Sequence, residues 1–216
     1  MILLTGFEPF GGDSSNPSWT AVLLAREILR AEGHEVEALE LPCVFGESAA
    51  VLREAIGRLR PELIICVGLA GGRDRLSLER VAINCDDARI PDNAGNRPID
   101  EPVIPAGPAA YFSTLPVKSA LRALQIAGIR AEVSQTAGTY VCNHVFYTLM
   151  HELSSAAVAA QARGGFIHVP YDEAQLPRGS AAPSMAARDM GEGIAVVVRT
   201  ALDAPVDAKL SAGAIH

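Results

Sequence analysis

Short apolar runs alternate with amphipathic stretches along the chain. A run of about four to eight apolar residues predicts a buried strand, whereas apolar residues three or four positions apart predict a helix. The predicted strands are 2–5, 35–41, 63–67, 81–83, 130–135 and 166–169, with 166–169 as the last strand of the chain. Five helices are predicted. One follows Asn16, two carry the apolar stripes 52–59 and 117–124, one starts near Cys142, and the last covers 184–201.

Local signals set the limits of several elements. Asn16 precedes Pro17, which is the pattern of an N-cap followed by proline at the first helical position. Gly71-Gly72 and Gly164-Gly165 predict turns. Residues 86–110 contain five prolines and predict a long irregular excursion, which in a compact domain is usually functional or covers something.

This order of strands and helices predicts an α/β fold with a mostly parallel sheet and helices on both faces. In such folds, functional sites lie beyond the carboxyl ends of the strands. The length of 216 residues predicts one domain over 1–216, in which 203–216 forms a C-terminal tail with no evident role.

Composition limits the binding partners and the cellular compartment that we expect for this protein. The net charge is −7 and no Lys or Arg cluster stands out, so neither nucleic acid nor a membrane is expected as a partner. No apolar run approaches the roughly 20 residues that span a bilayer, and the N-terminus lacks the pattern of a signal peptide. A cytoplasmic location is expected, with thiols rather than disulfides. No cysteine or histidine spacing indicates zinc, and no cofactor is expected.

Cys142 is the first candidate for chemistry, because it follows a strand and a turn and opens a predicted helix. The partial positive charge of a helix N-terminus lowers a thiol pKa, and the free N–H groups there can hold an oxyanion. The alternative is a buried cysteine that acts as a small hydrophobe. Cys66 is expected in the core, and Cys43 and Cys85 are expected to pack or to line a pocket.

A thiolate nucleophile needs a histidine base and a group that orients the base. His168 ends a predicted strand, where it is either this base or a structural histidine. Glu79 is either the orienting group or a solvated turn carboxylate, and local sequence favours the solvated turn. Arg89 either forms a salt bridge with a neighbouring carboxylate or polarises a substrate carbonyl.

Several blocks in this order resemble the pyroglutamyl peptidase type I family, which are cysteine exopeptidases. The blocks are GFEPFGG at 6–12 with NPS at 16–18, GGR at 71–73, ERVAIN at 79–84, DARIPDN at 87–93, SQTAGTYVCN at 134–143 and FIHVP at 166–170. The resemblance covers about residues 2–200. It implies a three-layer α/β/α sandwich around a mostly parallel twisted sheet, a cytosolic location and a homotetramer.

The resemblance also implies residue roles. Cys142, His168 and Glu79 match the catalytic residues, and the Cys142 N–H with Arg89 would hold the substrate carbonyl. Phe7, Phe10, Ile90, Tyr140 and Val141 match positions that bind the pyrrolidone ring of a peptide with N-terminal pyroglutamate. Tyr140 stands where the family often has Phe, and Cys43 stands where a small polar residue is common. A hydroxyl on a buried ring needs a hydrogen-bond partner.

Two other functions fit the residues. The first is a thiol amidase with the same catalytic residues and a different acyl group. The second is a non-catalytic small-molecule-binding protein in which Cys142 belongs to the core. A pocket that binds free carboxylates would favour the amidase, but no basic pair is placed for it.

Overall fold

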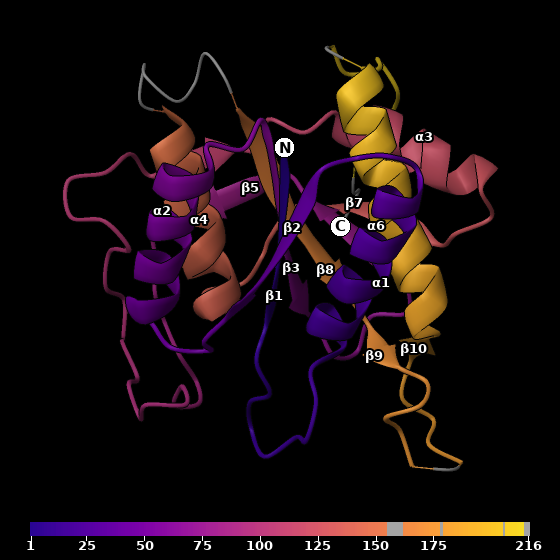
Figure 1. Cartoon of the computed structure of the whole chain (residues 1–216). Helices are drawn as coiled ribbons and strands as arrows, with labels where there is room; N and C mark the ends of the chain where they lie inside the picture. The colour runs from indigo at the N-terminus through magenta and orange to yellow at the C-terminus, as the bar shows by residue number, and fades with distance from the viewer. Residues whose placement is uncertain (155–161, 178, 205, 214–216) are drawn as a thin grey trace.

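The computed structural model describes residues 1–154, 162–177, 179–204 and 206–213 (Figure 1). The longer strands are β1 (Ile2–Phe7), β2 (Val36–Leu41), β3 (Leu63–Leu69), β4 (Leu76–Glu79), β7 (Ala131–Ser134) and β8 (Arg163–Val169). The short strands are β5 (Val81–Ile83), β6 (Ala110–Phe112), β9 (Tyr171–Asp172) and β10 (Ser184–Met185). The helices are α1 (Pro17–Ala31), α2 (Glu47–Leu59), α3 (Val117–Ile126), α4 (Val141–Ser154) and α6 (Ala187–Asp203).

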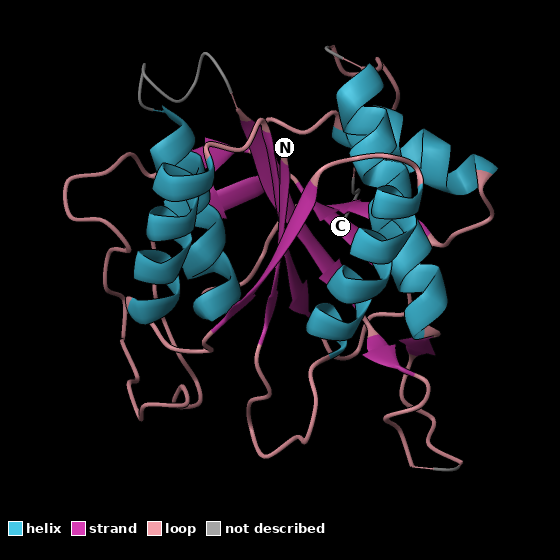
Figure 2. Cartoon of the chain, in the orientation of Figure 1, coloured by secondary structure: helices cyan, strands magenta, loops and turns pink. Residues whose placement is uncertain are grey.

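The main sheet has the strand order β2-β1-β3-β8-β4-β7. Its first four strands are parallel to one another, whereas β4 runs antiparallel to β8 and parallel to β7. Helices α2 and α4 cover one face, and α1, α3 and α6 cover the other (Figure 2). The expected three-layer sandwich around a mostly parallel, twisted sheet is confirmed.

Each face of the sheet has its own hydrophobic core because successive side chains of a strand point to opposite faces. In β1, Ile2 and Leu4 pack with α1, α3 and α6, while Leu3 packs with α2 and α4. The central strand β3 is buried along nearly its whole length, as a parallel strand covered by helices on both sides should be.

The local signals for helix boundaries were reliable at α1. The side chain of Asn16 accepts a hydrogen bond from the backbone N–H of Ser18, and Pro17 is the first helical residue. The excursion is irregular as predicted: between Ile83 and Ala110 the structure contains one isolated bridge, Asp86 with Glu101.

Some predicted boundaries were wrong. The segment Leu76–Glu79, for which no strand was predicted, is a buried strand of the main sheet. Gly164 and Gly165 lie inside β8, where a Cβ at Gly164 would come 2.9 Å from Ile64 O and from Leu153 Cδ1. Two short strands follow β8, and residues 184–185 form β10 instead of helix because they pair with β9.

The C-terminal tail has a structural contact that its sequence did not indicate. Asp207 Oδ1 accepts hydrogen bonds from the backbone N–H groups of Lys118, at 3.1 Å, and Ser119, at 2.8 Å. These N–H groups lie in the first turn of α3, whose N-cap, Pro116, makes no side-chain cap. The tail therefore caps α3, and a carboxylate there also favours the helix dipole. Residues 205 and 214–216 of the predicted tail lie outside the described residues.

None of the described helices is both long enough and apolar enough to cross a membrane.

Candidate active site

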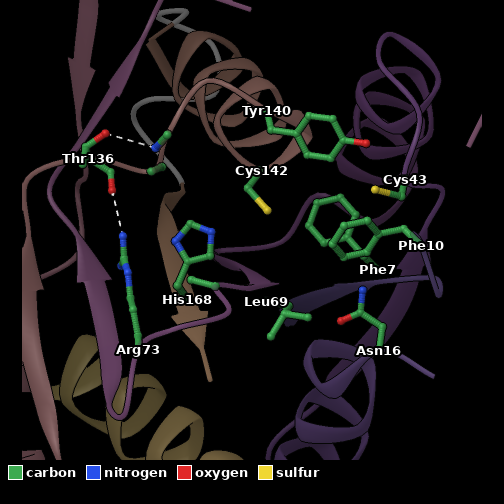
Figure 3. Close-up of a pocket in the computed structure, with 13 residues that line it drawn as sticks. Phe7, Phe10, Asn16, Cys43, Leu69, Arg73, Thr136, Tyr140, Cys142 and His168 are labelled. Atoms are coloured by element: carbon green, nitrogen blue, oxygen red, sulfur yellow. Dashed lines mark hydrogen bonds between the residues drawn. The ribbon is translucent and has the colours of Figure 1, made fainter. Parts of the chain in front are cut away.

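The carboxyl ends of the parallel strands meet at one apolar cavity of about 260 Å³ (Figure 3). Phe7 ends β1, Leu69 ends β3, and His168 lies one residue before the end of β8. Cys142 reaches the same cavity from the first turn of α4. Candidate residues from several strands and from α4 therefore lie together beyond the strand ends, at this cavity.

His168 and Glu79 form a buried pair on neighbouring strands. In the antiparallel pairing of β4 with β8, Glu79 lies opposite Phe166, so its side chain is on the same face as His168, two residues further along. His168 Nδ1 donates to Glu79 Oε1 over 2.7 Å. Glu79 is completely buried, which corrects the local prediction of a solvated turn carboxylate. A hydrogen bond at Nδ1 leaves Nε2 available to accept a proton.

Cys142 lies over the end of β3, next to His168. Gly68 pairs with His168 in the sheet, and a Cβ at Gly68 would come 2.7 Å from Cys142 Sγ. In Figure 3 the sulfur lies between the imidazole of His168 and the two rings of Phe7 and Phe10. The geometry thus brings a thiol, an imidazole and a carboxylate together in the order that nucleophilic catalysis uses.

The protonation state of Cys142 differs from the sequence prediction. The thiol is only partly exposed, and burial raises its pKa above the ordinary value for cysteine; Cys43 and Glu79 act in the same direction, and Arg73 opposes them. Burial is the largest of these influences, and the resulting direction is opposite to the lowered pKa expected from the sequence. The sulfur rests as a thiol, so a base must take its proton when it reacts.

The cavity wall is mainly apolar. Its apolar lining includes Phe7, Phe10, Cys43, Leu69, Ala137 and Tyr140. The remaining side chains that line it include Asn16, Arg73 and Thr136, and no Asp or Glu is among the described residues that line it. Such a cavity suits an uncharged ring better than a charged group, because an unpaired charge loses its hydration there.

The sequence analysis expected a hydrogen-bond partner for the hydroxyl of Tyr140, and the structure contains one. Its OH donates to the carbonyl oxygen of Pro91 over 3.0 Å, so the irregular excursion is attached to the cavity wall. Its ring makes an edge contact with Phe45, with centroids 5.4 Å apart. Beside it, Cys43 is buried, and burial with the Glu8 charge raises the pKa of its thiol to about 12. Cys43 is therefore an uncharged part of the wall.

Other hydrogen bonds hold this wall together. Glu8 Oε1 accepts from Cys43 N at 2.9 Å and from Asn93 Nδ2 at 2.8 Å. Asn93 N in turn donates to Cys43 O over 3.1 Å. Three loops that are distant in sequence are thereby joined at one edge of the cavity.

Three of the residues that the sequence assigned to substrate binding do not line the cavity. Arg89 and Ile90 are exposed, and neither lines the cavity. Val141, the first residue of α4, is fully buried in the core. Phe7, Phe10 and Tyr140 do line the cavity, so the structure gathers part of the expected binding set around Cys142.

All four cysteines are free thiols, and Cys66 lies in the core as expected. Within the described ranges, no cluster of three or more His, Cys, Asp or Glu side chains is arranged to hold a metal ion.

The family model described as pyroglutamyl peptidase matches residues 1–204 of the chain. The chain belongs to the pyroglutamyl peptidase family. As a member it is a cysteine peptidase, a hydrolase that removes N-terminal pyroglutamate from peptides.

Named relatives are similar over their whole length. A pyrrolidone-carboxylate peptidase of Escherichia fergusonii is 54% identical over 100% of this chain and 99% of its own. One of Streptomyces coelicolor is 52% identical with the same coverage of both chains. The crystal structure of pyroglutamyl peptidase I from Bacillus amyloliquefaciens superposes with a TM-score of 0.90 at 44% identity, covering 97% of this chain and 98% of that one.

Arg73 and Gly68 are among the residues at this cavity to which the sequence analysis assigned no role. Arg73 lines the cavity and donates to Glu79 Oε1 over 2.8 Å, and Gly68 provides the space that the Cys142 sulfur occupies. Arg73 belongs to the block Gly71-Gly72-Arg73, so its position was marked although its partner was not. Gly68 sits within an apolar strand run and carries no local signal.

Proposed function

We propose that this pyroglutamyl peptidase acts through a thioester on Cys142, with His168 as general base and Glu79 as the carboxylate that orients the imidazole. The observation that supports this most directly is the buried His168–Glu79 pair beside the Cys142 thiol at an apolar cavity. A nucleophile, a base and an orienting group are the parts that acyl transfer by a thiol requires.

The reaction begins when His168 Nε2 takes the proton of the Cys142 thiol as the sulfur attacks the pyroglutamyl carbonyl carbon. A C–S bond forms and the carbonyl oxygen becomes an oxyanion. When this intermediate collapses, the C–N bond breaks and His168 gives its proton to the leaving amine. Water then attacks the thioester with His168 as base, releasing pyroglutamate and restoring the thiol. Glu79 stabilises the imidazolium that forms in each half of the reaction.

The oxyanion is held first by the backbone N–H of Cys142. This N–H lies in the first turn of α4, where backbone N–H groups have no partner within the helix. Arg89 is the second donor that we propose, although its side chain is exposed and does not line the cavity. One donor of this kind typically contributes about 10²–10³ in rate.

The pyrrolidone ring is bound by Phe7, Phe10 and Tyr140, which line the cavity. The family resemblance adds Ile90 and Val141 as further positions, although neither side chain lines the cavity. A lactam carries no ammonium group, so it enters an apolar cavity without burying a charge. An ordinary N-terminus is charged, and the cavity lining offers it no carboxylate. Arg73 at the cavity also disfavours a second positive charge. The ring pocket therefore accounts for specificity.

The test compares pyroglutamyl-naphthylamide with prolyl-naphthylamide, which has a similar ring but a charged amine. Wild type, Cys142→Ser and Cys85→Ser are assayed side by side in reducing buffer. Cys85 is the matched control, since it is a partly exposed thiol that does not line the cavity. We expect turnover of the pyroglutamyl compound alone, lost only in Cys142→Ser. Activity that survives in Cys142→Ser removes Cys142 from its role, and equal turnover of both compounds refutes the specificity argument.

We further propose that residues 1–216 form one catalytic domain with 203–216 as its tail, and that the protein is a cytoplasmic homotetramer. The family resemblance supports the tetramer, and the four free thiols agree with a reducing compartment. Light scattering on the purified protein would measure the mass, and a value for a single chain would refute the tetramer.

A further inference from the structure

Arg73 forms hydrogen bonds both to Glu79, the partner of His168, and to the turn that precedes Cys142. It follows the Gly71-Gly72 turn between β3 and β4. One guanidinium nitrogen, Nη1, donates to Glu79 Oε1 over 2.8 Å. The other, Nη2, donates to the carbonyl oxygen of Thr136 over 3.3 Å, a hydrogen bond drawn in Figure 3. Thr136 lies in the turn that leads into α4 and Cys142. One side chain thus links the carboxylate behind the base to the loop before the nucleophile.

The buried carboxylate needs a permanent cation. Glu79 has no exposed surface, its Oε1 accepts from both His168 and Arg73, and its Oε2 has no hydrogen-bond partner. If His168 were the only group available to neutralise Glu79, the pair would hold its proton on the imidazole. An imidazole that is already protonated cannot accept the proton of the thiol. Arginine stays charged at every working pH and so removes this demand.

We propose that Arg73 is a positioning residue that keeps His168 neutral, and so able to act as base, while fixing the turn before Cys142. This inference rests on the proposed roles of Cys142, His168 and Glu79. It adds a fourth residue whose charge neutralises Glu79 and whose second hydrogen bond fixes the turn. The lowering effect of Arg73 on the pKa of Cys142 agrees with this role, although burial is the larger influence.

The charged and titratable groups around the His168–Cys142 pair come from five parts of the fold. Glu79 faces His168 from β4, and Arg73 faces Glu79 from the loop before it. Cys43 lies across the cavity after β2, Cys66 lies in β3, and Tyr140 lines the cavity just before α4, with burial raising the pKa of its hydroxyl. Burial holds both cysteines uncharged, with the pKa of each raised to about 12. Arg73 is therefore the permanent positive charge in this set.

The experiment measures kcat/KM for pyroglutamyl-naphthylamide against pH in wild type, Arg73→Gln, Arg73→Lys and Arg75→Gln. Arg73→Gln leaves His168 as the only partner that can neutralise Glu79, and it removes the charge that lowers the pKa of Cys142. We expect both limbs of its pH profile to move upward by roughly one pH unit. We also expect the maximum of kcat/KM to fall about 10- to 100-fold. Arg75 is the matched control because it pairs with Asp74 at the surface of the same loop, and its variant should keep the wild-type profile.

Arg73→Lys separates charge from geometry. Lysine keeps the charge but cannot reach Glu79 and Thr136 together with one compact ammonium. We expect wild-type limbs with a lower kcat. Limbs that stay in place in Arg73→Gln, or move in Arg73→Lys, would overturn the proposal; if Arg73→Gln fails to fold in a urea titration, Arg73→Lys decides alone. A failure of the proposed function is recognised separately, because Cys142→Ser would then stay active.

Discussion

Replacing Gly68 with alanine would put a methyl group against the sulfur of Cys142. The added Cβ would lie 2.7 Å from Cys142 Sγ and 2.8 Å from Cζ of Phe166. The Phe166 ring is fully buried and packs on Phe146 and His168, with ring centroids 5.7 and 4.9 Å away. Because that ring is confined, the sulfur has to move.

The size of the effect follows from these contacts. Non-bonded heavy atoms settle at about 3.5–4.0 Å, so the sulfur must retreat by roughly 1 Å. A misplacement of about 1 Å can cost on the order of 10²-fold in rate. Overpacking of this kind also lowers the free energy of unfolding by about 1–3 kcal/mol. We therefore expect a folded but much slower enzyme.

The assay is kcat/KM for pyroglutamyl-naphthylamide, with urea unfolding of the same preparations. Gly57→Ala is the matched control, since Gly57 is exposed within α2 and a Cβ there meets nothing within 4 Å. That variant should keep full activity and gain about 0.5–1 kcal/mol in the free energy of unfolding. Wild-type kcat/KM in folded Gly68→Ala would refute the placement of the sulfur over β3.

Two further substitutions test the cavity wall and the oxyanion donors. Tyr140→Phe deletes the hydrogen bond to Pro91 O, so we expect a higher KM and a loss of about 1 kcal/mol in the free energy of unfolding. Unchanged KM and urea midpoint would show that the hydroxyl does not hold the wall. Arg89→Gln should lower kcat by about 10²-fold if its guanidinium turns inward to the substrate carbonyl. An unchanged kcat would leave the oxyanion to the backbone N–H of Cys142.

The sequence predicted the elements that have strong local signals. Apolar periodicity located the helices, and Asn16 with Pro17 marked the start of α1 to the residue. It failed at Leu76–Glu79, because a strand of four residues that ends in glutamate looks like a turn. Glu79 is buried with hydrogen bonds from Arg73 and from His168. His168 lies 89 residues away in the sequence, so no local window around residue 79 contains this partner.

The candidate site shows the same limit. The blocks of residues named Cys142, His168 and Glu79, which meet at the cavity. The effect of a helix N-terminus predicted a lowered pKa for Cys142, but burial by distant segments reverses the direction. Gly68 was missed because its requirement arises from α4 and β8, which fold over it. Tertiary contacts decided each of these properties.

The reacting groups and the ring pocket are built on different kinds of backbone. His168 and Glu79 stand on paired strands in the interior of the sheet, whereas Glu8, Cys43 and Asn93 join loops at its rim. Loops accept insertions and exchanges that strands do not. New acyl preferences could therefore be selected in a library that varies the rim and leaves the sheet untouched, much as antibodies vary their loops on a constant framework.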